Sequence, residues 1–481
     1  EIFKAQAMIL DDPELIGSTK KMIKEQKINL ESAFFEVAEG FAGMLEGLDD
    51  EYLAARALDI RDVASRLLRI LLGIAESPAE NLNTPSIIIA KDLTPSDSIL
   101  LDKSFILGFA TALGGATSHT SILARGLGLP AVVGAGLEVL EYDDGEKIIL
   151  DGDLGQILLD VNKQTLKLYQ ARQQKDSEVK VKVEKFRHGK TITKDGHQVE
   201  VAANIGNIED AIIALDAGAE GVGLLRSEFL FLERTAEPTE EEQYQSYKAI
   251  ADTFGEHPVV LRSLDVGGDK DIPYIDQPEE ENPFLGFRAI RLCLDRPKLF
   301  KPQLRAALRA GYDTNLKLMF PMVATVEEVR QVREVLEECR AELKLEGQKV
   351  ADLMEIGIMI EIPAAAIMAD QLADEVDFFS IGTNDLAQYT LAADRTNSQV
   401  SQLASAFQPA VFRLIKLVID SAHKKGKWVG LCGELAGELL AIPILLGLGL
   451  DEFSMNPPAI PFAKYLIRSI TLKQAKEVAK E

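Results

Sequence analysis

The sequence of 481 residues has few cysteines, a deficit of basic residues and no long apolar run. Its three cysteines are odd in number and far apart, which argues against a disulfide framework. Lysine and arginine total 52 against 76 aspartates and glutamates, a net charge of −24, so the chain lacks the basic surface that a nucleic acid needs. No apolar run approaches the roughly 20 residues that cross a bilayer. These deficits favour a soluble, reduced, cytoplasmic protein with neither a nucleic-acid nor a membrane partner.

Residues 1–75 have the pattern of a helical bundle. Asp12 followed by Pro13 is a helix-start signal, and Asn29 can cap the next helix. From Asp50 onward, apolar residues recur at steps of three and four, which predicts one long helix with a single apolar face. Because the sequence begins inside this helical region without an initiator methionine, we expect a chain truncated at its N-terminus.

Residues 76–160 change to short apolar runs and glycine-rich turns. The runs at 86–90 and 105–109 predict buried strands, and 114–134 holds a glycine-rich loop before a short helix. This alternation indicates a small α/β domain. Residues 161–190 are rich in lysine, glutamine and glutamate, and they predict an exposed linker helix.

Residues 191–481 alternate short apolar runs with helical segments. Eight runs are predicted as strands: Val199–Ile205, Gly221–Leu225, Val259–Leu264, Leu316–Phe320, Gly357–Ile360, Phe378–Ile381, Trp428–Leu431 and Glu452–Met455. Eight strands separated by helices over about 290 residues is the rhythm of a (β/α)8 barrel. A doubly wound open sheet is the alternative. We prefer the barrel because of the polar residues that follow the runs.

Charged and polar residues follow most of the runs, at the positions where a barrel carries its active site. They are Arg226, Glu228, Arg262, Asp265, Lys270, Arg288, Glu361, Asn384, Asp385, Arg395, Cys432 and Glu434. Arginines that lie close together repel one another unless an anion binds between them, so this set indicates an anionic substrate. The planar guanidinium group donates paired hydrogen bonds that suit phosphate and carboxylate oxygens. A Glu and an Asp from separate strands match a Mg2+ site, whereas the absence of histidine from these positions argues against a zinc hydrolase.

Two candidate residues are ambiguous when each is taken alone. A single cysteine is more often a small core residue, and for Cys432 alone we favour that interpretation. His119 follows Gly114-Gly115-Ala116-Thr117-Ser118 at the start of a short predicted helix. The helix dipole there favours a neutral imidazole and then stabilises a transferred phosphoryl group. A loop histidine without chemistry is an equally good interpretation of His119 alone.

Six stretches occur in one order along nearly the whole chain. They are GGATSHTSILARGLGLPAVVG (114–134), RSLDVGGDK (262–270), NPFLGFRAIR (282–291), GIMIEIPAAA (357–366), FFSIGTNDLAQYTLAADR (378–395) and GLCGELAG (430–437). Together they resemble enzyme I, the phosphoenolpyruvate–protein phosphotransferase family of the bacterial sugar phosphotransferase system. Similar phosphohistidine loops occur in pyruvate phosphate dikinase and phosphoenolpyruvate synthase, but the second and fifth stretches are similar to enzyme I instead.

The resemblance implies roles for particular residues. His119 would accept a phosphoryl group from phosphoenolpyruvate, and Cys432 would protonate the enolate carbon to give pyruvate. Glu361 and Asp385 would be the Mg2+ ligands. Substrate binding would fall to Arg226, Arg262, Lys270, Arg288, Asn384, Asp385 and Arg395.

The resemblance also implies roles for the domains. Residues 1–75 would dock the carrier protein HPr, which receives the phosphoryl group from His119. Residues 76–160 would form a swivelling phosphohistidine domain, joined by the linker helix 161–190 to the phosphoenolpyruvate-binding barrel of 191–481. The barrel would also form a homodimer.

Three other functions remain open from the sequence. A nitrogen-related paralogue of enzyme I shares these motifs but carries an extra N-terminal sensory domain. A fragment of a dikinase or synthase would need an ATP-grasp domain elsewhere. A non-catalytic regulatory homologue that binds HPr-like carriers is disfavoured, because His119, Arg226, Arg262, Glu361, Asp385 and Cys432 are all present.

Overall fold

The chain divides into two compact units, Glu1–Lys175 and Asp176–Glu481. The dividing point falls within a long, mostly exposed helix, α7 (Lys163–Phe186). The computed structural model describes residues 12–46, 51–73, 84–93, 105–115, 120–121, 123–124, 128–232, 234, 236–267, 272, 274–275, 280–395, 397 and 399–480.

Three helices come first in the described chain: α2 (Pro13–Gln26), α3 (Leu30–Glu46) and α4 (Glu51–Leu72). The Asp12 side chain accepts hydrogen bonds from the first-turn amides of α2, and Asn29 Oδ1 accepts one from the Ser32 amide. Both predicted caps are therefore confirmed. The helices pack through a small apolar core that includes Leu15, Phe34, Val37, Ala38 and Ala64.

The rest of the first unit contains a small parallel sheet and a hairpin. The sheet has the order β1 (Ser86–Ala90), β2 (Ile106–Thr111) and β3 (Ala131–Val132), and η3 (Leu137–Glu141) follows it. The antiparallel hairpin joins β4 (Ile149–Asp151) to β5 (Gln156–Leu158). Strands therefore occur at both predicted runs, 86–90 and 105–109.

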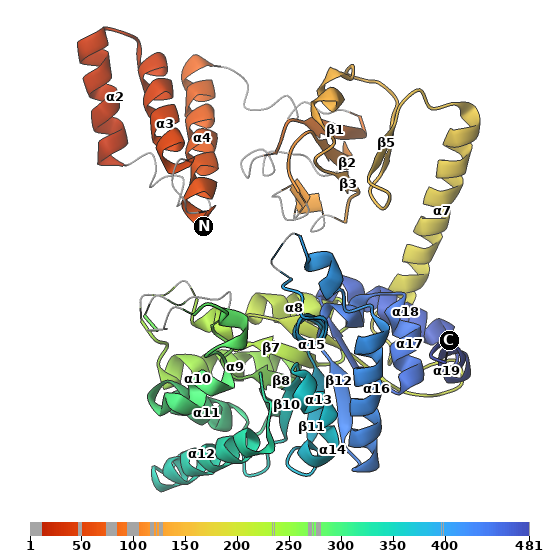
Figure 1. Ribbon diagram of the computed structural model, residues 1–481. Coiled ribbons are helices and arrows are strands. Elements are labelled where there is room, and N and C mark those ends of the chain that lie inside the picture. The colour runs from red at the N-terminus through yellow and green to blue at the C-terminus, as the bar shows by residue number, and fades with distance from the viewer. Residues whose placement is uncertain are drawn as a thin grey trace. The chain divides into compact units, whose positions relative to one another are not determined.

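Eight parallel strands close into a barrel in the second unit (Figure 1). They are β6 (Glu200–Ile205), β7 (Val222–Arg226), β8 (Val259–Arg262), β9 (Leu316–Phe320), β10 (Ile356–Ile360), β11 (Phe378–Ile381), β12 (Trp428–Leu431) and β13 (Glu452–Met455). Neighbouring strands follow chain order, and β13 pairs with β6 to close the ring. The α/β multidomain fold with a (β/α)8 barrel is thus confirmed, and the open-sheet alternative is wrong.

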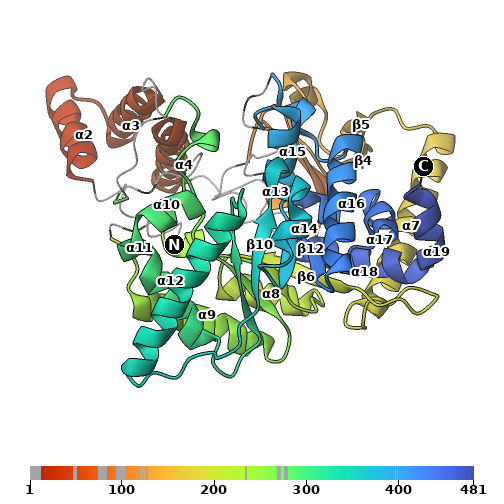
Figure 2. The ribbon, with the colours of Figure 1, turned by 60° about the horizontal axis from the view of Figure 1, so that its bottom comes forward.

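Helices surround the strands, as the second view shows (Figure 2). They are α8 (Ile208–Asp216), α9 (Glu240–Phe254), α10 (Ile290–Asp295), α11 (Pro297–Ala310), α12 (Val326–Leu345), α13 (Pro363–Ile367), α14 (Ala369–Leu372), α15 (Thr383–Leu391), α16 (Pro409–Lys424), α17 (Ala441–Leu448), α18 (Ile460–Ser469) and α19 (Leu472–Val478). Short 3-10 turns lie between them: η4 (Ser227–Leu230), η5 (Pro283–Leu285), η6 (Ser401–Ala404), η7 (Glu434–Gly437) and η8 (Pro457–Ala459). Thr239 and Thr325 begin α9 and α12 with complete capping boxes.

One helical stretch, Ser401–Lys424, is long and apolar enough to span a membrane by length and composition. It is no continuous apolar run, since Arg413 and Lys416 lie within it, and a helix of a protein core passes the same test. Within this stretch α16 contacts β11 and β12, and Val411, Ile415 and Val418 are fully buried there. The apolar face of α16 therefore packs against the strands of the barrel.

Strand residues alternate between two cores. Val259, Leu261 and their equivalents on other strands face the helices in the main core. Residues at the intervening positions point into the barrel and form a second cluster: Leu224, Val260, Met319, Met359, Phe378 and Cys432. At the edge of this cluster, Phe378 stacks on the partly buried Trp428, with ring centroids 4.4 Å apart.

Two carboxyl groups lie inside the barrel among these residues. Glu452 on β13 is 2% exposed, and its register partner on β6 is Glu200. A Cβ atom added at Gly223 or Gly430 would lie 2.4 or 2.7 Å from Glu452 Oε1, so the carboxyl fills space that these glycines leave. Burial, and then the charge of Glu200, raises the pKa of Glu452 to about 8.

This raised pKa predicts that the barrel loses stability as the pH rises. Between the ordinary pKa of 4.5 and about 8, the folded chain keeps a proton on Glu452 that the unfolded chain releases. The free energy of unfolding therefore falls over this range. Glu452→Gln should make the fall shallower and raise the Tm near pH 8 by roughly 2–4 °C, the effect of about 1 kcal/mol in a domain of this size.

Thermal unfolding followed by the fluorescence of Trp428, the single tryptophan, measures this effect. The matched control is Glu209→Gln, which removes an exposed carboxyl group from α8. A pH dependence as steep in Glu452→Gln as in the unmodified chain would contradict the prediction.

Candidate active site

The polar residues predicted to follow the strands lie at one mouth of the barrel. Arg226 ends β7, and its register partner Arg262 ends β8. Glu361 directly follows β10, Asp385 lies in the first turn of α15 after β11, and Cys432 directly follows β12. Because the strands are parallel, their carboxyl ends share one mouth, where barrel active sites are found.

Asp265 joins two buried arginines at this mouth. Its Oδ2 lies 3.1 Å from Arg262 Nη1, and its Oδ1 accepts a hydrogen bond of 2.9 Å from Arg288 Nη2. Arg262 Nη2 also donates to Glu228 Oε1 at 2.5 Å. All four side chains are at most 7% exposed. Burial alone would lower the pKa of Arg262, but Glu228 and Asp265 raise it above its ordinary value, so the guanidinium stays charged.

Gly267 lets these two segments approach. Its φ of 100° lies in the region that favours glycine, and a Cβ there would be 2.6 Å from the Cβ of Arg288. The loop after Asp265 can therefore pass directly beside Arg288, which places the carboxylate and the guanidinium in contact.

Asp385 extends the network toward solvent. Its Oδ1 lies 3.4 Å from Arg288 Nη1, and its Oδ2 lies 3.2 Å from Arg395 Nη1. The Arg395 side chain is 30% exposed, whereas that of Arg288 is 1% exposed. Both guanidinium groups lie over the ring of Phe284, at 5.8 and 5.6 Å from its centroid.

Glu361 is buried beside this network. Its Oε2 accepts a hydrogen bond of 2.8 Å from the Met322 amide, and the residue is 1% exposed. Burial, and then the charges of Asp385 and Asp265, raises the pKa of Glu361 to about 7, while Arg262 opposes the shift. The carboxyl groups therefore repel one another when all are ionised.

A divalent cation between Glu361 and Asp385 would remove this repulsion. Mg2+ commonly takes one or two carboxylates and completes its shell with water and substrate oxygens. The described residues contain no cluster of three or more His, Cys, Asp or Glu side chains suited to a metal. The pair thus fits a cation that is held jointly with a substrate.

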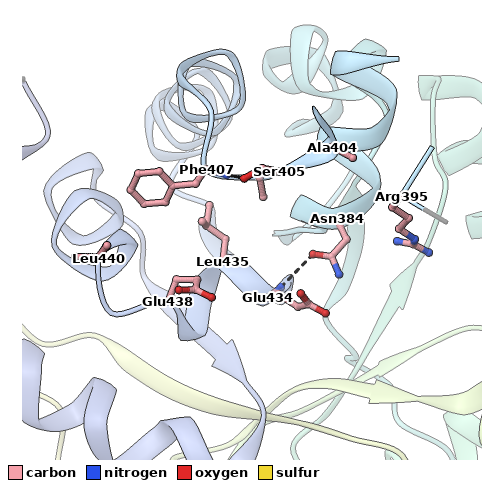
Figure 3. A pocket seen from close by; sticks show the side chains of 10 residues that line it. Asn384, Arg395, Ala404, Ser405, Phe407, Glu434, Leu435, Glu438 and Leu440 are labelled. Carbon is pink, nitrogen blue, oxygen red and sulfur yellow. Dashed lines mark hydrogen bonds between the residues drawn. The ribbon is translucent and has the colours of Figure 1, made fainter. Parts of the chain in front are cut away.

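A cavity of about 730 Å3 opens beside Asn384 and Arg395 (Figure 3). Asn384 Oδ1 accepts a hydrogen bond of 3.3 Å from the Glu434 amide, which fixes the side-chain amide at the cavity wall. The other lining residues are Ala404, Ser405, Ala406, Phe407, Leu435, Glu438 and Leu440. The cavity is therefore polar on the side of Asn384 and Arg395 and largely apolar on the other.

Cys432 belongs to both the core and the site. It packs in the interior cluster and is 4% exposed, as the core interpretation requires. Burial raises the pKa of its thiol to about 11, and nearby Ser380 and Arg262 oppose this shift whereas Glu361 adds to it. The thiol is therefore protonated near neutral pH and lies next to the charged network.

The structure brings most of the predicted site residues together. Asp265 links Arg262 to Arg288, and Asp385 links Arg288 to Arg395, as described above. Arg226 stands at the same mouth and has no ion-pair partner among the described residues. The predicted residues His119 and Lys270 lie outside the described residues.

Four residues of the network were not assigned to the site from the sequence. Glu228 and Asp265 were noted only as strand-end residues, although their position directly after strands is the signal that identified the others. Phe284 and Tyr389 carry no such signal. The Tyr389 hydroxyl accepts from Arg288 Nη1 at 3.4 Å and donates to the Phe284 carbonyl at 2.5 Å, and only the fold brings them together.

Three family descriptions match consecutive parts of the chain. They are the PEP-binding domain of PEP-utilising enzymes at residues 180–472, the mobile domain of PEP-utilising enzymes at 82–155, and the N-terminal domain of PEP-utilising enzymes at 1–56. The first alone covers more than half of the chain.

Two curated proteins that are similar to the chain carry the same name. A phosphoenolpyruvate-protein phosphotransferase of Priestia megaterium is 50% identical over 98% of this chain and 82% of its own length. One of Staphylococcus carnosus is 49% identical over 99% of this chain and 83% of its own length. A solution NMR structure of Enzyme I is 40% identical, covers 37% of this chain and 71% of its own, and has a TM-score of 0.32. By its sequence likeness over nearly its whole length, the chain belongs to the phosphoenolpyruvate-protein phosphotransferase family of PEP-utilising enzymes.

Proposed function

We propose that the chain transfers the phosphoryl group of phosphoenolpyruvate to His119 and then to the carrier protein HPr. The observation that supports this most directly is the convergence of Arg226, Arg262, Arg288 and Arg395 with two carboxylates at one mouth of the barrel. Phosphoenolpyruvate carries a phosphate and a carboxylate, and both are matched by guanidinium forks.

The substrate would displace part of the existing ion-pair network. Arg226 has no ion-pair partner among the described residues and can take a phosphate oxygen without breaking a contact. Arg395 is 30% exposed and lines the cavity beside Asn384, so its guanidinium group can reach a substrate bound there. Asn384 would donate its amide hydrogens from the cavity wall, and Lys270 would add a further cation.

Glu361 and Asp385 would hold Mg2+ with the substrate, as their mutual repulsion supports. The bound ion would neutralise charge on the phosphoryl oxygens. Buried Arg262 and Arg288 would stabilise the loose transition state, in which charge spreads over those same oxygens. They need no reorganisation at that moment, because Asp265 already fixes both guanidinium groups.

Two groups would complete the reaction. The neutral imidazole of His119 would attack phosphorus in line with the leaving enolate oxygen. Cys432, whose thiol keeps its proton, would deliver that proton to the enolate carbon and so release pyruvate.

The other units of the chain would serve this transfer. We propose that residues 1–75 dock HPr, that 76–160 swivel as the phosphohistidine domain about the linker helix 161–190, and that the barrel of 191–481 forms a homodimer. The swivelling follows from the chemistry, because one histidine must reach the barrel mouth and later a separate protein. Cytoplasmic location stays a prediction from the sequence.

His119→Ala should abolish labelling of the chain by phosphoenolpyruvate that carries a labelled phosphate. The alanine side chain offers no nucleophilic nitrogen, whereas the fold should be unchanged. Acid-labile protein phosphate is the measurement, with His423→Ala on the outer helix α16 as the control that keeps full labelling. Persistent labelling of His119→Ala would overturn the nucleophile assignment.

Glu361→Gln should raise the Mg2+ concentration needed for half-maximal activity by at least about 10-fold, because one anionic ligand is lost. Activity is titrated with Mg2+ at saturating phosphoenolpyruvate. Glu337→Gln, an equal charge change on the exposed face of α12, should leave the titration unaltered. An unshifted midpoint for Glu361→Gln would remove this residue from the ligand set.

Cys432→Ser should slow pyruvate formation by about 10^2- to 10^4-fold, because a hydroxyl is a much weaker proton donor than a thiol. The KM for phosphoenolpyruvate should stay within twofold of normal, since the arginines are untouched (a twofold change is about 0.4 kcal/mol). Cys339→Ala, at a buried cysteine packed under the outer helices, is the control. A normal rate for Cys432→Ser would return this thiol to a purely structural role.

A further inference from the structure

A set of polar groups lies inside the barrel on the side of Cys432 away from the substrate mouth. Ser380 on β11, Gly430 on β12 and Glu452 on β13 occupy one layer, because Gly430 is the register partner of both others. Cys432 stands two residues after Gly430, so it faces the same interior one layer nearer the mouth. The Ser380 hydroxyl interacts with the Cys432 thiol.

The absence of side chains at two glycines leaves room between these groups. Glu452 Oε1 lies 2.4 Å from the point where a Cβ of Gly223 would stand, and 2.7 Å from that of Gly430. These glycines are on different strands, so the carboxyl group projects into the centre of the barrel. Apart from the contact of Ser380 Oγ with the Cys432 thiol, neither Glu452 Oε1 nor Ser380 Oγ has a hydrogen-bond partner among the described residues. Buried polar groups in proteins are normally hydrogen-bonded, so the Ser380 hydroxyl and the Glu452 carboxyl are suited to each other, directly or through a water.

The layer continues from Glu452 toward the opposite mouth. Glu200 on β6 is the register partner of Glu452 on β13, and its Oε1 is also without a partner among the described residues. Glu200 lines a cavity of about 770 Å3 at the amino-terminal end of the barrel, together with His257, Asp451 and Lys464. Protons can therefore enter and leave Glu200 from that side.

Both carboxyl groups keep their protons to a higher pH than an ordinary glutamate does. Burial, and then Glu220, raises the pKa of Glu200 to about 7, and the pKa of Glu452 is about 8 as described above. The charged groups that face Glu452 are Glu200, Lys317 and Asp451. Lys317 lowers the pKa of both glutamates, but it is itself paired with exposed Glu355 at 2.6 Å.

We propose that the barrel interior carries a proton path from its amino-terminal cavity to Cys432, through Glu200, Glu452 and Ser380. The path would restore the thiol after each turnover, because the product and the charged network cover Cys432 on the other side. This inference rests on the proposed role of Cys432 as proton donor. Glu452 acts through Cys432 and does not touch the substrate.

The steps balance without any redox change. The S–H bond of Cys432 breaks as a C–H bond forms on the enolate carbon of pyruvate, and the electron pair stays on sulfur. Ser380 then gives its hydroxyl proton to the thiolate and takes one from the Glu452 carboxyl. Glu452 takes a proton from Glu200, and Glu200 takes one from hydronium or a buffer acid in the cavity, so each pyruvate formed consumes one solvent proton.

The variant Glu452→Gln tests the path, because it should slow the later turnovers and leave the rate of the first turnover unchanged. Cys432 starts protonated, so pyruvate formed in a single turnover with phosphoenolpyruvate and Mg2+ should appear at the normal rate. Steady-state turnover with HPr as acceptor should fall by about 10-fold, because each cycle then waits for a slower proton source. The KM for phosphoenolpyruvate should not change. Glu256→Gln, which removes an exposed carboxyl group before β8 at the same amino-terminal end, should behave normally in both assays.

The pH profile adds a readout that a structural role would not move. The steady-state rate of the unmodified chain should decline above about pH 8 as Glu452 loses its proton, and Glu452→Gln should lack this decline. Gly430→Ala, whose added methyl group enters the space beside Glu452, should reproduce the loss of turnover with a normal first cycle. Normal fluorescence of Trp428 in each variant shows that the barrel is folded.

Two results would overturn the path. Steady-state turnover of Glu452→Gln at the normal rate is one, and an equal slowing of the first and later cycles is the other. Failure of the proposed function is distinguishable, because the unmodified chain would then form no pyruvate in the first turnover.

Discussion

The site depends on the pairing of buried guanidinium groups with buried carboxylates. Arg262 and Arg288 are almost inaccessible to water, and an unpaired charge in that position costs several kcal/mol. Asp265 bridges them, and Asp385 links Arg288 to Arg395 nearer the surface. The carboxylates therefore hold the guanidinium groups in fixed orientations before a substrate binds. Such preorganisation is the condition for strong electrostatic stabilisation of a phosphoryl transition state.

The barrel makes this pairing possible because it gathers distant segments at one mouth. Asp265 and Asp385 are 120 residues apart in sequence, yet both reach Arg288. The same barrel also holds polar groups in its interior, where glycines on β7 and β12 leave room for the carboxyl group of Glu452. Because burial keeps this carboxyl group neutral, the free energy of unfolding of the barrel falls as the pH rises. Buried groups with shifted pKa values are common at functional sites.

Much of the fold was predictable from local patterns. The bounds of all eight barrel strands were predicted to within a few residues. Each strand is a short apolar run bounded by turns, and segments with helical periodicity separate most of these runs. The sequence does not show what covers the apolar residues of 401–424, and only the packing of α16 on β11 and β12 does. Within the site, Arg288 was found through a recognised motif, whereas Tyr389 and Phe284 were not found, since neither follows a strand.

By itself the sequence determined the order of elements, the class of barrel and the residue types at the strand ends, because these depend on hydrophobic period and local turn chemistry. Only the tertiary structure decided which carboxylate meets which arginine, since a contact such as that of Arg288 with Asp385, 97 positions apart, leaves no local pattern. It also decided that Ser380, Glu452 and Glu200 share the space inside the barrel. That arrangement depends on strand register, and register is settled when the ring of strands closes.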